Sequence, residues 1–354
     1  MDTGETQLPL ALDAMGGDLG SGEVIAGLAI ALKDKRVQGS VIVVGDEQVT
    51  KPLLAREGLS GNPRVHTLHA SEIIHMHDKP VQALRQKKDA SMVRAIELVR
   101  DKRAGAVVSL GNTGAMMACG TLRLRPMEGV ERPAIATVMP TRGARWILID
   151  GGANPDPDPT HLVHNAILGS NYAKIVLNIA KPRVGLLSIG TEEGKGTPRT
   201  TLTDQMLRKI DGVVDYLGLI EGFQMFSRHA DVIVCDGFTG NVLLKSLESC
   251  YEMLKTSIVS EIKGHPIRML GALLMRGTFS SLKKELSPAD LGGAPFLGLN
   301  GLIFKAHGSS SRDYVAGAIR IAQKASADHI NEKIAKDIAA ARERLENGDE
   351  LLEE

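Results

Sequence analysis

Short apolar segments that run directly into polar, glycine-containing turns recur along this chain, and this pattern constrains its fold most. The clearest case is the run 109–117, which contains Gly111, Asn112, Thr113 and Gly114. The apolar segment 106–108 comes directly before this run, and residues 115–124 after the turn are rich in Ala, Met and Leu, as in a helix. A strand, a turn and a helix N-terminus bring several backbone N–H groups to one point, where an anion can bind. In many proteins, however, small polar residues at such a turn only cap the helix. This run alone is therefore compatible with either anion binding or helix capping.

The apolar segments alternate with amphipathic ones over most of the chain. Strands are predicted at 9–13, 41–45, 65–68, 106–108, 134–139, 146–150, 184–189 and 232–235. Helices are predicted at 23–35, 48–57, 81–100, 115–124, 160–180, 202–210, from 237 to about 262, and from 313 to 345 with a break. This spacing indicates right-handed crossovers and a mostly parallel sheet covered by helices on both faces.

Composition excludes several classes of protein. Lysine plus arginine equals aspartate plus glutamate at 42 each, which argues against nucleic acid as a general partner. The three cysteines form no C-x-x-C pair, so neither a disulfide framework nor a zinc site is expected. No apolar run approaches the roughly 20 residues that cross a bilayer, and the polar, acidic N-terminus does not resemble a secretory signal.

Residues 263–284 differ from the rest because they contain basic and apolar residues and no acidic one. The segment predicts a basic helical hairpin with an apolar tip. Such a hairpin can lie on an anionic membrane or meet an acidic partner, or it can pack in a dimer interface. The residues expected at a membrane or carrier-protein contact are Lys263, Arg268, Leu273, Leu274, Arg276, Lys283 and Lys284.

Four turns share the same design and predict one polar, anion-binding cleft, because the carboxyl ends of parallel strands lie along one edge of a sheet. None matches the nucleotide-binding loop or the dinucleotide fingerprint, so neither ATP nor NAD is expected. The candidate residues are Asp13, Gly16, Gly17 and Asp18 in the first turn, Asn112, Thr113 and Gly114 in the second, Asn154 in the third, and Asp236, Gly240 and Asn241 in the fourth.

Isolated residues add weaker candidates. Lys195, in a glycine-rich loop, has the charge to hold phosphate or an oxyanion, although exposed lysines are also common on surfaces. His307 is a further candidate for the cleft. His161 and His164 lie three apart, a spacing more typical of packing or capping than of metal binding, and no metal site is predicted.

Several motifs, taken together and in this order, resemble the phosphate acyltransferase (PlsX) family of bacterial phospholipid synthesis from about Leu10 to Ala325. The motifs are 12–18, 111–115, 131–134, 152–154, 187–190, 235–241 and 305–308. The sequence departs from the family pattern at Pro155, Thr191 and Ser21, none of which removes a group that the chemistry needs.

The resemblance implies a three-layer αβα sandwich, similar to phosphotransacetylase and isopropylmalate dehydrogenase, with a protruding helical hairpin at about 250–285. One α/β domain would span 8–330 and a charged helical tail 331–354. It also implies a cytoplasmic homodimer that contacts the inner face of the cell membrane, and possibly the downstream glycerol-phosphate acyltransferase.

The implied reaction converts acyl-acyl carrier protein and inorganic phosphate to acyl phosphate and free carrier protein, without a cofactor. The backbone of 112–114 would hold phosphate or the tetrahedral oxyanion together with Asn154 and Asn241, while Lys195 offsets charge and Asp236 orients a neighbour. Three alternatives remain: a phosphotransacetylase-like enzyme that uses acyl-CoA, an NAD-dependent decarboxylating dehydrogenase, and a non-catalytic membrane protein that recruits carrier protein.

Overall fold

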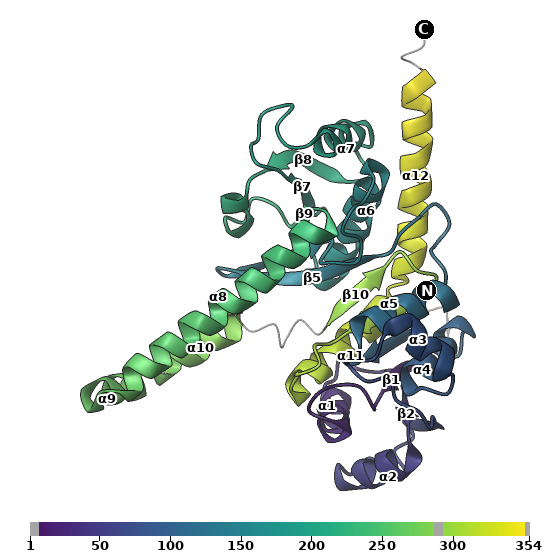
Figure 1. The fold of residues 1–354 in the computed structure, drawn as a ribbon, viewed down its shortest axis with the longest axis vertical. Helices are drawn as coiled ribbons and strands as arrows, with labels where there is room; N and C mark the ends of the chain where they lie inside the picture. Colours follow the sequence, from purple (N-terminus) through teal and green to yellow (C-terminus); the bar gives the residue numbers. More distant parts are fainter. Residues whose placement is uncertain (1–6, 287–292, 351–354) are drawn as a thin grey trace.

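One twisted β-sheet forms the centre of the molecule (Figure 1). The computed structural model describes residues 7–286 and 293–350. In this part of the chain eleven strands lie in the order β3-β2-β1-β4-β11-β10-β5-β6-β9-β7-β8. Their bounds are β1 Leu10–Asp13, β2 Val41–Gly45, β3 Val65–His69, β4 Ala106–Ser109, β5 Ala134–Thr141, β6 Ala144–Ile149, β7 Arg183–Leu187, β8 Asp215–Ile220, β9 Val232–Val234, β10 Ala294–Leu297 and β11 Leu302–Lys305.

Helices cover both faces of this sheet, so the predicted three-layer α/β architecture is confirmed. Before the hairpin they are α1 Ser21–Lys33, α2 Glu47–Arg56, α3 Pro80–Gln86, α4 Ser91–Arg100, α5 Thr113–Arg123, α6 Pro159–Val176, α7 Pro198–Lys209 and the 3₁₀ turn η1 Gly222–Phe226. The remaining helices are α8 Gly237–Lys263, α9 Pro266–Leu274, α10 Arg276–Leu286, α11 Arg312–Ala327 and α12 Ile330–Glu350.

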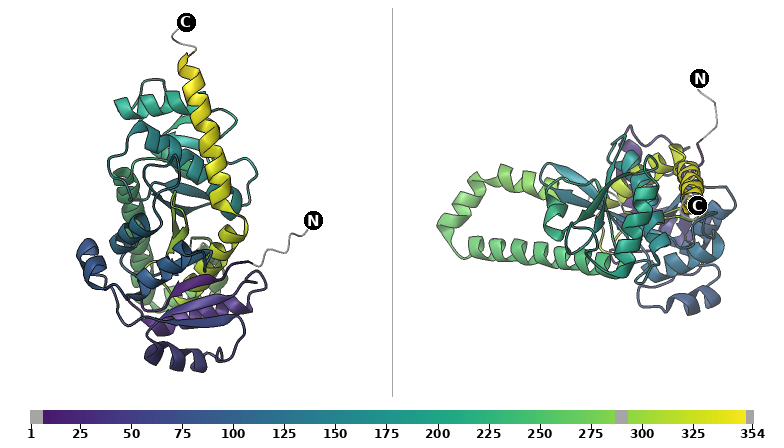
Figure 2. Two further views of the ribbon diagram at one scale, coloured as in Figure 1. Left: turned by 90° about the vertical axis from the view of Figure 1, so that its right-hand side faces the viewer. Right: turned by 90° about the horizontal axis from the view of Figure 1, so that it is seen from above.

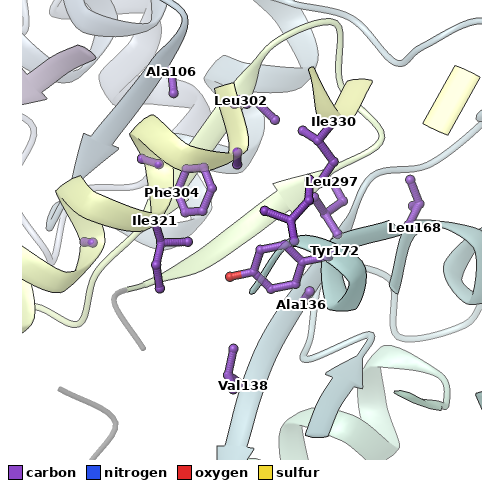
Figure 3. Close-up of a cluster of buried hydrophobic side chains, with 14 of the residues drawn as sticks. Ala106, Ala136, Val138, Leu168, Tyr172, Leu297, Leu302, Phe304, Ile321 and Ile330 are labelled. Atoms are coloured by element: carbon purple, nitrogen blue, oxygen red, sulfur yellow. The ribbon is translucent and has the colours of Figure 1, made fainter. Parts of the chain in front are cut away.

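The two faces of the sheet are packed differently. On one face a continuous core joins the strands to α1, α6, α11 and α12; Figure 3 shows part of it, where Tyr172 and Phe304 lie among aliphatic side chains. On the other face one cluster lies under α4 and α5, and a separate one lies under the start of α8. Alternate residues of β5 and β11 face the two sides, as the two-residue period of a strand requires. The second face is therefore divided into two halves.

The direction of the strands also changes between the halves. Strands β1, β2, β3, β4 and β11 are mutually parallel, whereas β10 runs antiparallel to β11 and to β5, and β5 runs antiparallel to β6. Strands β9, β7 and β8 continue parallel to β6. Consequently β6, β9, β7 and β8 run in the opposite sense to β1 and β4, a reversal that the apolar pattern of the sequence did not predict.

The long helix predicted at 81–100 is wrong, because the chain forms α3 and α4 with a break between them. Asp89 in the break accepts hydrogen bonds from the backbone N–H and hydroxyl of Ser71, at 2.8 and 2.7 Å. Its own N–H donates to Glu72 Oε2 at 2.8 Å, and Ala90 forms a β-bridge with Glu72. These contacts with a distant segment replace the local bonds of a continuous helix.

The predicted hairpin protrudes from the body of the protein (Figures 1 and 2). Helix α8 is its outgoing limb, α9 forms the tip, and α10 returns. The tip leaves Ile267, Leu273 and Leu274 exposed by 86, 64 and 82%. Lys263, Arg268 and Arg276 are exposed as well, and Arg268 pairs with Glu261. The side chains of Lys283 and Lys284 lie outside the described residues.

The break predicted in the last helix is found between α11 and α12, where His329 has a φ of 51°. Helix α12 was predicted to carry a solvated charged face, but it also has an apolar side. Ile330, Ile334, Ile338 and Ala341 of this helix are buried in the core of the first face. No described helix is long and apolar enough to span a membrane.

Candidate functional site

The ends of β1, β4 and β11 form one group of polar residues, which we call the Lys305 cluster (13–18, 109–114 and 305–309). Asp13 is buried at the end of β1, where Ser109 Oγ donates to its Oδ2 at 2.6 Å. Burial raises the pKa of Asp13, and hydrogen bonds from Ser109 and neighbouring groups oppose that rise. A Cβ on Gly16 would lie 2.7 Å from the backbone nitrogen of Gly111, so only glycine allows these turns to lie this close.

Lys305 supplies a half-buried positive charge to this cluster. It lies at the end of β11, beside Ser109 of β4, and its Nζ donates to the carbonyl of Ala306. Burial lowers the pKa of Lys305 to about 8; the carboxylate of Asp18 opposes this and the ammonium group of Lys245 adds to it. A cation that is hard to solvate is well suited to pair with a bound anion.

The turn with His307 holds Asp18 against this lysine. The N–H of Asp18 donates to the carbonyl of Gly308 at 2.7 Å, and a Cβ on Gly308 would lie 2.5 Å from Asp18 Oδ2. His307 itself is exposed, with its Nδ1 2.8 Å from Ser309 Oγ. The first turn and the turn after β11 are thus brought together, as expected for a common site.

Asn112 is committed to structure rather than to a ligand. Its Oδ1 accepts from the N–H of Ala115 at 3.0 Å, which caps α5. Its Nδ2 donates to the carbonyls of Met76 and Asp78, at 2.8 and 3.2 Å. What remains for an anion at this turn is the exposed N-terminus of α5 at Thr113 and Gly114, whose first backbone N–H groups have no partner within the helix.

The ends of β6 and β9 form a second group, the Asp150 cluster (150–154 and 236–241). Asp150 is fully buried, and its carboxylate accepts backbone hydrogen bonds from Ile135, Gly152, Ala153 and Asn154 at 2.7–3.1 Å. Burial raises the pKa of Asp150, and these backbone donors oppose the rise. A single side chain therefore shapes the whole turn from which Asn154 projects.

Helix α8 begins directly against that turn. Its Gly237 donates its N–H to the carbonyl of Asn154 at 2.8 Å, and a Cβ on Gly240 would lie 2.0 Å from the carbonyl oxygen of Asp150. Asp236 caps the helix, since its carboxylate accepts from the N–H and hydroxyl of Thr239, both at 2.8 Å.

Two amide groups remain available in this cluster. Asn154 is half-buried and Asn241 exposed, and in the described part of the chain neither side chain makes a hydrogen bond. A Cβ on Gly152 would lie 3.2 Å from Cβ of Asn241, so the two turns are in close contact. The Asp150 cluster thus presents free amide groups beside the N-terminus of a long helix, a suitable environment for an anion.

Lys195 lies in an exposed loop that follows β7. Its side chain folds over Gly190, with Cγ and Cδ 3.0 and 3.2 Å from the position of a Cβ on that glycine. Its carbonyl accepts from Ser188 Oγ at 3.2 Å, which ties the loop to the end of β7. No ion pair of Lys195 occurs among residues 7–286 and 293–350, so its charge is available to a ligand.

The four turns do not lie along one edge of a parallel sheet, contrary to the premise of their prediction. Strands β6 and β9 run opposite to β1, β4 and β11. At the usual twist of about 20–25° per strand, however, the five steps from β4 to β9 rotate the strands by roughly 100–125°. The carboxyl ends of the two halves therefore differ in direction by roughly 55–80° instead of pointing in opposite directions. Lys245, two turns into α8, is near enough to Lys305 to affect its pKa.

His161 and His164 have structural roles, capping and packing, as their spacing of three residues suggests. His161 Nδ1 accepts from the N–H of Asp158 at 2.9 Å in a capping box, and His161 Nε2 lies 2.8 Å from Glu131 Oε2. Burial lowers the pKa of His164 to about 4, so it is neutral at physiological pH. Among the described residues, no group of three or more His, Cys, Asp or Glu side chains is arranged to hold a metal ion.

Comparison with known proteins identifies the family. A family model described as "Fatty acid synthesis protein" matches residues 8–333. A phosphate acyltransferase of Heliobacterium modesticaldum is 43% identical over 89% of this chain and 93% of its own length. That of Elusimicrobium minutum is 42% identical over 95% and 98%. The chain belongs to the phosphate acyltransferase family. The resemblance inferred from the motifs is thereby confirmed, and the protein is an acyltransferase.

Solved structures show the same fold at low sequence identity. A phosphotransacetylase of Streptococcus pyogenes matches 92% of this acyltransferase and 96% of its own chain, with a TM-score of 0.61 at 15% identity. A branched-chain phosphotransacylase of Enterococcus faecalis covers 90% and 99%, with a TM-score of 0.55 at 15% identity. The predicted phosphotransacetylase-like fold is confirmed.

Two residues of the site were not singled out from the sequence. Lys305 stands at the end of a four-residue strand, too short for a periodic signal, and its burial depends on strands and helices far away in the chain. The sequence pattern identifies Asp150 only as part of a turn, although its carboxylate accepts the backbone hydrogen bonds that shape that turn. A carboxylate directly followed by two glycines at the end of an apolar run was the available signal.

Proposed function

We propose that this acyltransferase transfers the acyl group of acyl-acyl carrier protein to inorganic phosphate, and that the acyl phosphate formed enters phospholipid synthesis. The observation that carries the proposal is the occurrence of two polar turn clusters at helix N-termini together with two cations. Lys305 is half-buried, and Lys195 forms no ion pair in the described part of the chain. Its relatives in Heliobacterium modesticaldum and Elusimicrobium minutum are phosphate acyltransferases, which supports the same reaction.

In this proposal phosphate binds between the N-termini of α5 and α8, with Lys305 and Lys195 beside it. The N–H groups at Thr113 and Gly114 and the amides of Asn154 and Asn241 are hydrogen-bond donors for its oxygens. Lys305 and Lys195 offset its negative charge. Asp13, Gly16, Gly17, Asp18, Gly240 and His307 act on this site through the shape of the turns, and Asp236 through the capped start of α8.

The chemistry needs no covalent intermediate on the protein. An oxygen of hydrogen phosphate attacks the thioester carbonyl and the C–O bond forms. The C–S bond then breaks, and the leaving carrier thiolate takes up the proton that the phosphate loses. Cys119 and Cys235 are poor nucleophiles for a competing route, because both are buried and burial raises their pKa. Lys195 is the proposed oxyanion stabiliser, because it forms no ion pair in the described part of the chain and follows β7, the strand next to β9.

The proposed acyl donor is the carrier protein, and acyl-CoA is the alternative because solved phosphotransacetylases share the fold. Purified protein is incubated with palmitoyl-acyl carrier protein or palmitoyl-CoA, with and without phosphate. Release of free carrier protein only when phosphate is present supports the proposal. Faster acyl phosphate formation from the CoA ester would reassign the donor, and release without phosphate would refute transfer to phosphate.

The same assay distinguishes a phosphate acyltransferase from the other two alternatives, a non-catalytic recruiter of carrier protein and an NAD-dependent dehydrogenase. A protein that only recruits carrier protein would bind the acyl donor and leave its thioester intact. A decarboxylating dehydrogenase would reduce NAD when supplied with a metal and a hydroxy acid. We expect thioester loss dependent on phosphate and no NADH.

We also propose that the hairpin mediates formation of a homodimer and contact with the membrane. Its exposed apolar residues occur on both the limbs and the tip, and Leu254 and Ile258 of α8 are exposed by 53 and 49%. The limbs are suited to pair with those of a second subunit in a homodimer. The tip, with Leu273, Leu274 and the nearby basic residues, is suited to an anionic membrane surface. A cytoplasmic enzyme that touches the membrane could pass its product to a glycerol-phosphate acyltransferase there.

A further inference from the structure

Three large apolar side chains that do not belong to the core are exposed at strand ends in the same half of the sheet as the Asp150 cluster. Ile189, Phe223 and Phe238 are exposed by 82, 75 and 65%. Single exposed apolar residues are common on proteins, but a contiguous group of them usually marks a binding surface. We refer to these three residues as the apolar patch.

Strand register places the three residues just beyond the ends of three neighbouring strands. Val234 of β9 pairs with Leu186 of β7, and Leu187 pairs with Ile220 of β8. Phe238, Ile189 and Phe223 follow within four residues of that row, at the ends of three adjacent strands. Adjacent strands lie about 4.8 Å apart, so the patch extends roughly 10 Å from the end of β9 to that of β8.

One end of the patch adjoins the proposed reacting groups. Phe238 precedes Asn241 by three residues on α8, and residues three apart on a helix are neighbours on its surface. Ile189 directly precedes Gly190, over which the side chain of Lys195 folds. Starting at the amide of Asn241, the order along the surface is therefore Phe238, then Ile189, then Phe223.

Phe226, another aromatic residue of η1, provides a comparison because its side chain packs within the fold. Phe226 packs edge-to-face on Trp146 with ring centroids 6.0 Å apart, and its carbonyl accepts from Thr141 Oγ1 at 2.7 Å. In the described part of the chain Phe223 and Phe238 make no such ring contact. Packing on Trp146 therefore accounts for the position of Phe226, whereas no packing contact of this kind accounts for Phe223 or Phe238.

We propose that the apolar patch binds the acyl chain of the donor, with the chain crossing the ends of β9, β7 and β8 in that order. This inference rests on the proposed function and assigns Phe238, Ile189 and Phe223 to the acyl chain of its donor. An extended alkyl chain is the linear, apolar ligand that fits a row of such side chains. Each methylene removed from water strengthens binding about fourfold, so a row of this length selects for long chains.

The position of each residue along the row predicts a different dependence on chain length. We would measure kcat/KM with butyryl-, octanoyl- and palmitoyl-acyl carrier protein for the wild type, Phe238→Ala and Phe223→Ala. Phe238→Ala should lower the octanoyl and palmitoyl values by roughly tenfold. Phe223→Ala should lower the palmitoyl value by a similar factor and leave the butyryl value unchanged. Leu122→Ala is a matched control, since Leu122 is 67% exposed on α5, in the other half of the sheet.

Two outcomes would overturn the inference. Equal losses with all three donors would assign the patch to the reaction centre or to carrier-protein docking. A change in subunit stoichiometry, measured by light scattering on the variants, would show that a second copy of the chain covers it. Because the side chains are exposed, the melting temperature should not change.

A binding measurement separates failure of this inference from failure of the proposed function. Calorimetric titration with palmitoyl pantetheine, without phosphate, reports the patch even if no acyl phosphate forms with any donor. We expect binding by the wild type that weakens roughly tenfold in Phe223→Ala. Equal affinity in the two proteins would refute the inference whatever the activity.

Discussion

Replacing Lys305 by methionine should change substrate binding and stability in opposite directions. The substitution keeps the length and most of the volume of the side chain while removing its charge. A hydrogen bond to a charged partner contributes about 1.5–3 kcal/mol, and about 1.4 kcal/mol corresponds to a factor of ten in binding. If Lys305 holds phosphate as proposed, Lys305→Met raises the phosphate KM by roughly 10- to 150-fold.

The stability effect follows from the depressed pKa of this lysine. Its pKa falls from 10.5 to about 8 on folding, which corresponds to a cost of roughly 3 kcal/mol for burying the charged form. The cost is fully present below pH 8 and is relieved as the pH rises from 8 toward 10.5, where the unfolded chain also loses its proton. Lys305→Met therefore increases the free energy of unfolding at pH 7 by up to about 3 kcal/mol, and the gain shrinks at alkaline pH.

The pH dependence of catalysis supplies an independent check. The wild type should lose affinity for phosphate as the pH rises through about 8, because the ammonium group deprotonates there, and Lys305→Met should lack this limb. Initial rates over a range of phosphate concentrations give KM, and urea denaturation gives stability. An unchanged KM together with lower stability would show that Lys305 is a structural residue, and the reasoning from its burial would be refuted.

Three further predictions concern the rest of the site and the hairpin. Lys195→Ala should lower kcat about 10²–10³-fold with the melting temperature unchanged, while Lys35→Ala, another exposed lysine, should leave kcat unaltered. Gly240→Ala should lower the free energy of unfolding by about 1–3 kcal/mol in urea denaturation, because its Cβ would overlap a backbone carbonyl; Gly264→Ala, whose Cβ has no neighbour nearer than 3.7 Å, should be neutral. Leu274→Asp should weaken co-sedimentation with anionic vesicles at least tenfold and leave kcat with soluble donor intact; equal sedimentation would exclude the tip as the membrane contact.

Local patterns in the sequence predicted the fold where the stabilising contacts are themselves local. Strand β2 and helix α2 lie within one residue of their expected bounds, since each has an apolar pattern and Asp46 caps the helix. Strand β10 escaped prediction because it has four residues and contains Pro295. The break between α3 and α4 escaped because its cause, the pairing of Asp89 with Ser71, lies 18 residues away.

The same distinction applies to the candidate site. Glycines and amides in turns could be recognised from sequence, but the pattern could not separate amides that cap or brace the fold from those that are free. The side chain of Asn112 makes hydrogen bonds with four backbone groups, whereas the amide of Asn241 is exposed. Nor could it reveal Lys305, because the low pKa of that lysine depends on burial by separate elements of the fold.

Helix α8 gives the two proposed contacts of the enzyme a fixed separation. It begins at the Asp150 cluster and continues for 27 residues to Lys263, which corresponds to about 40 Å at 1.5 Å per residue. Its start is held by the cap of Asp236 and by the close packing of Gly237 and Gly240, so the helix cannot pivot without disturbing the turn that carries Asn154. A membrane contact at the hairpin tip would therefore orient the reaction site relative to the lipid surface. It follows that shortening the hairpin beyond α8 should alter transfer of the product to a membrane-bound acceptor while leaving phosphate binding unchanged.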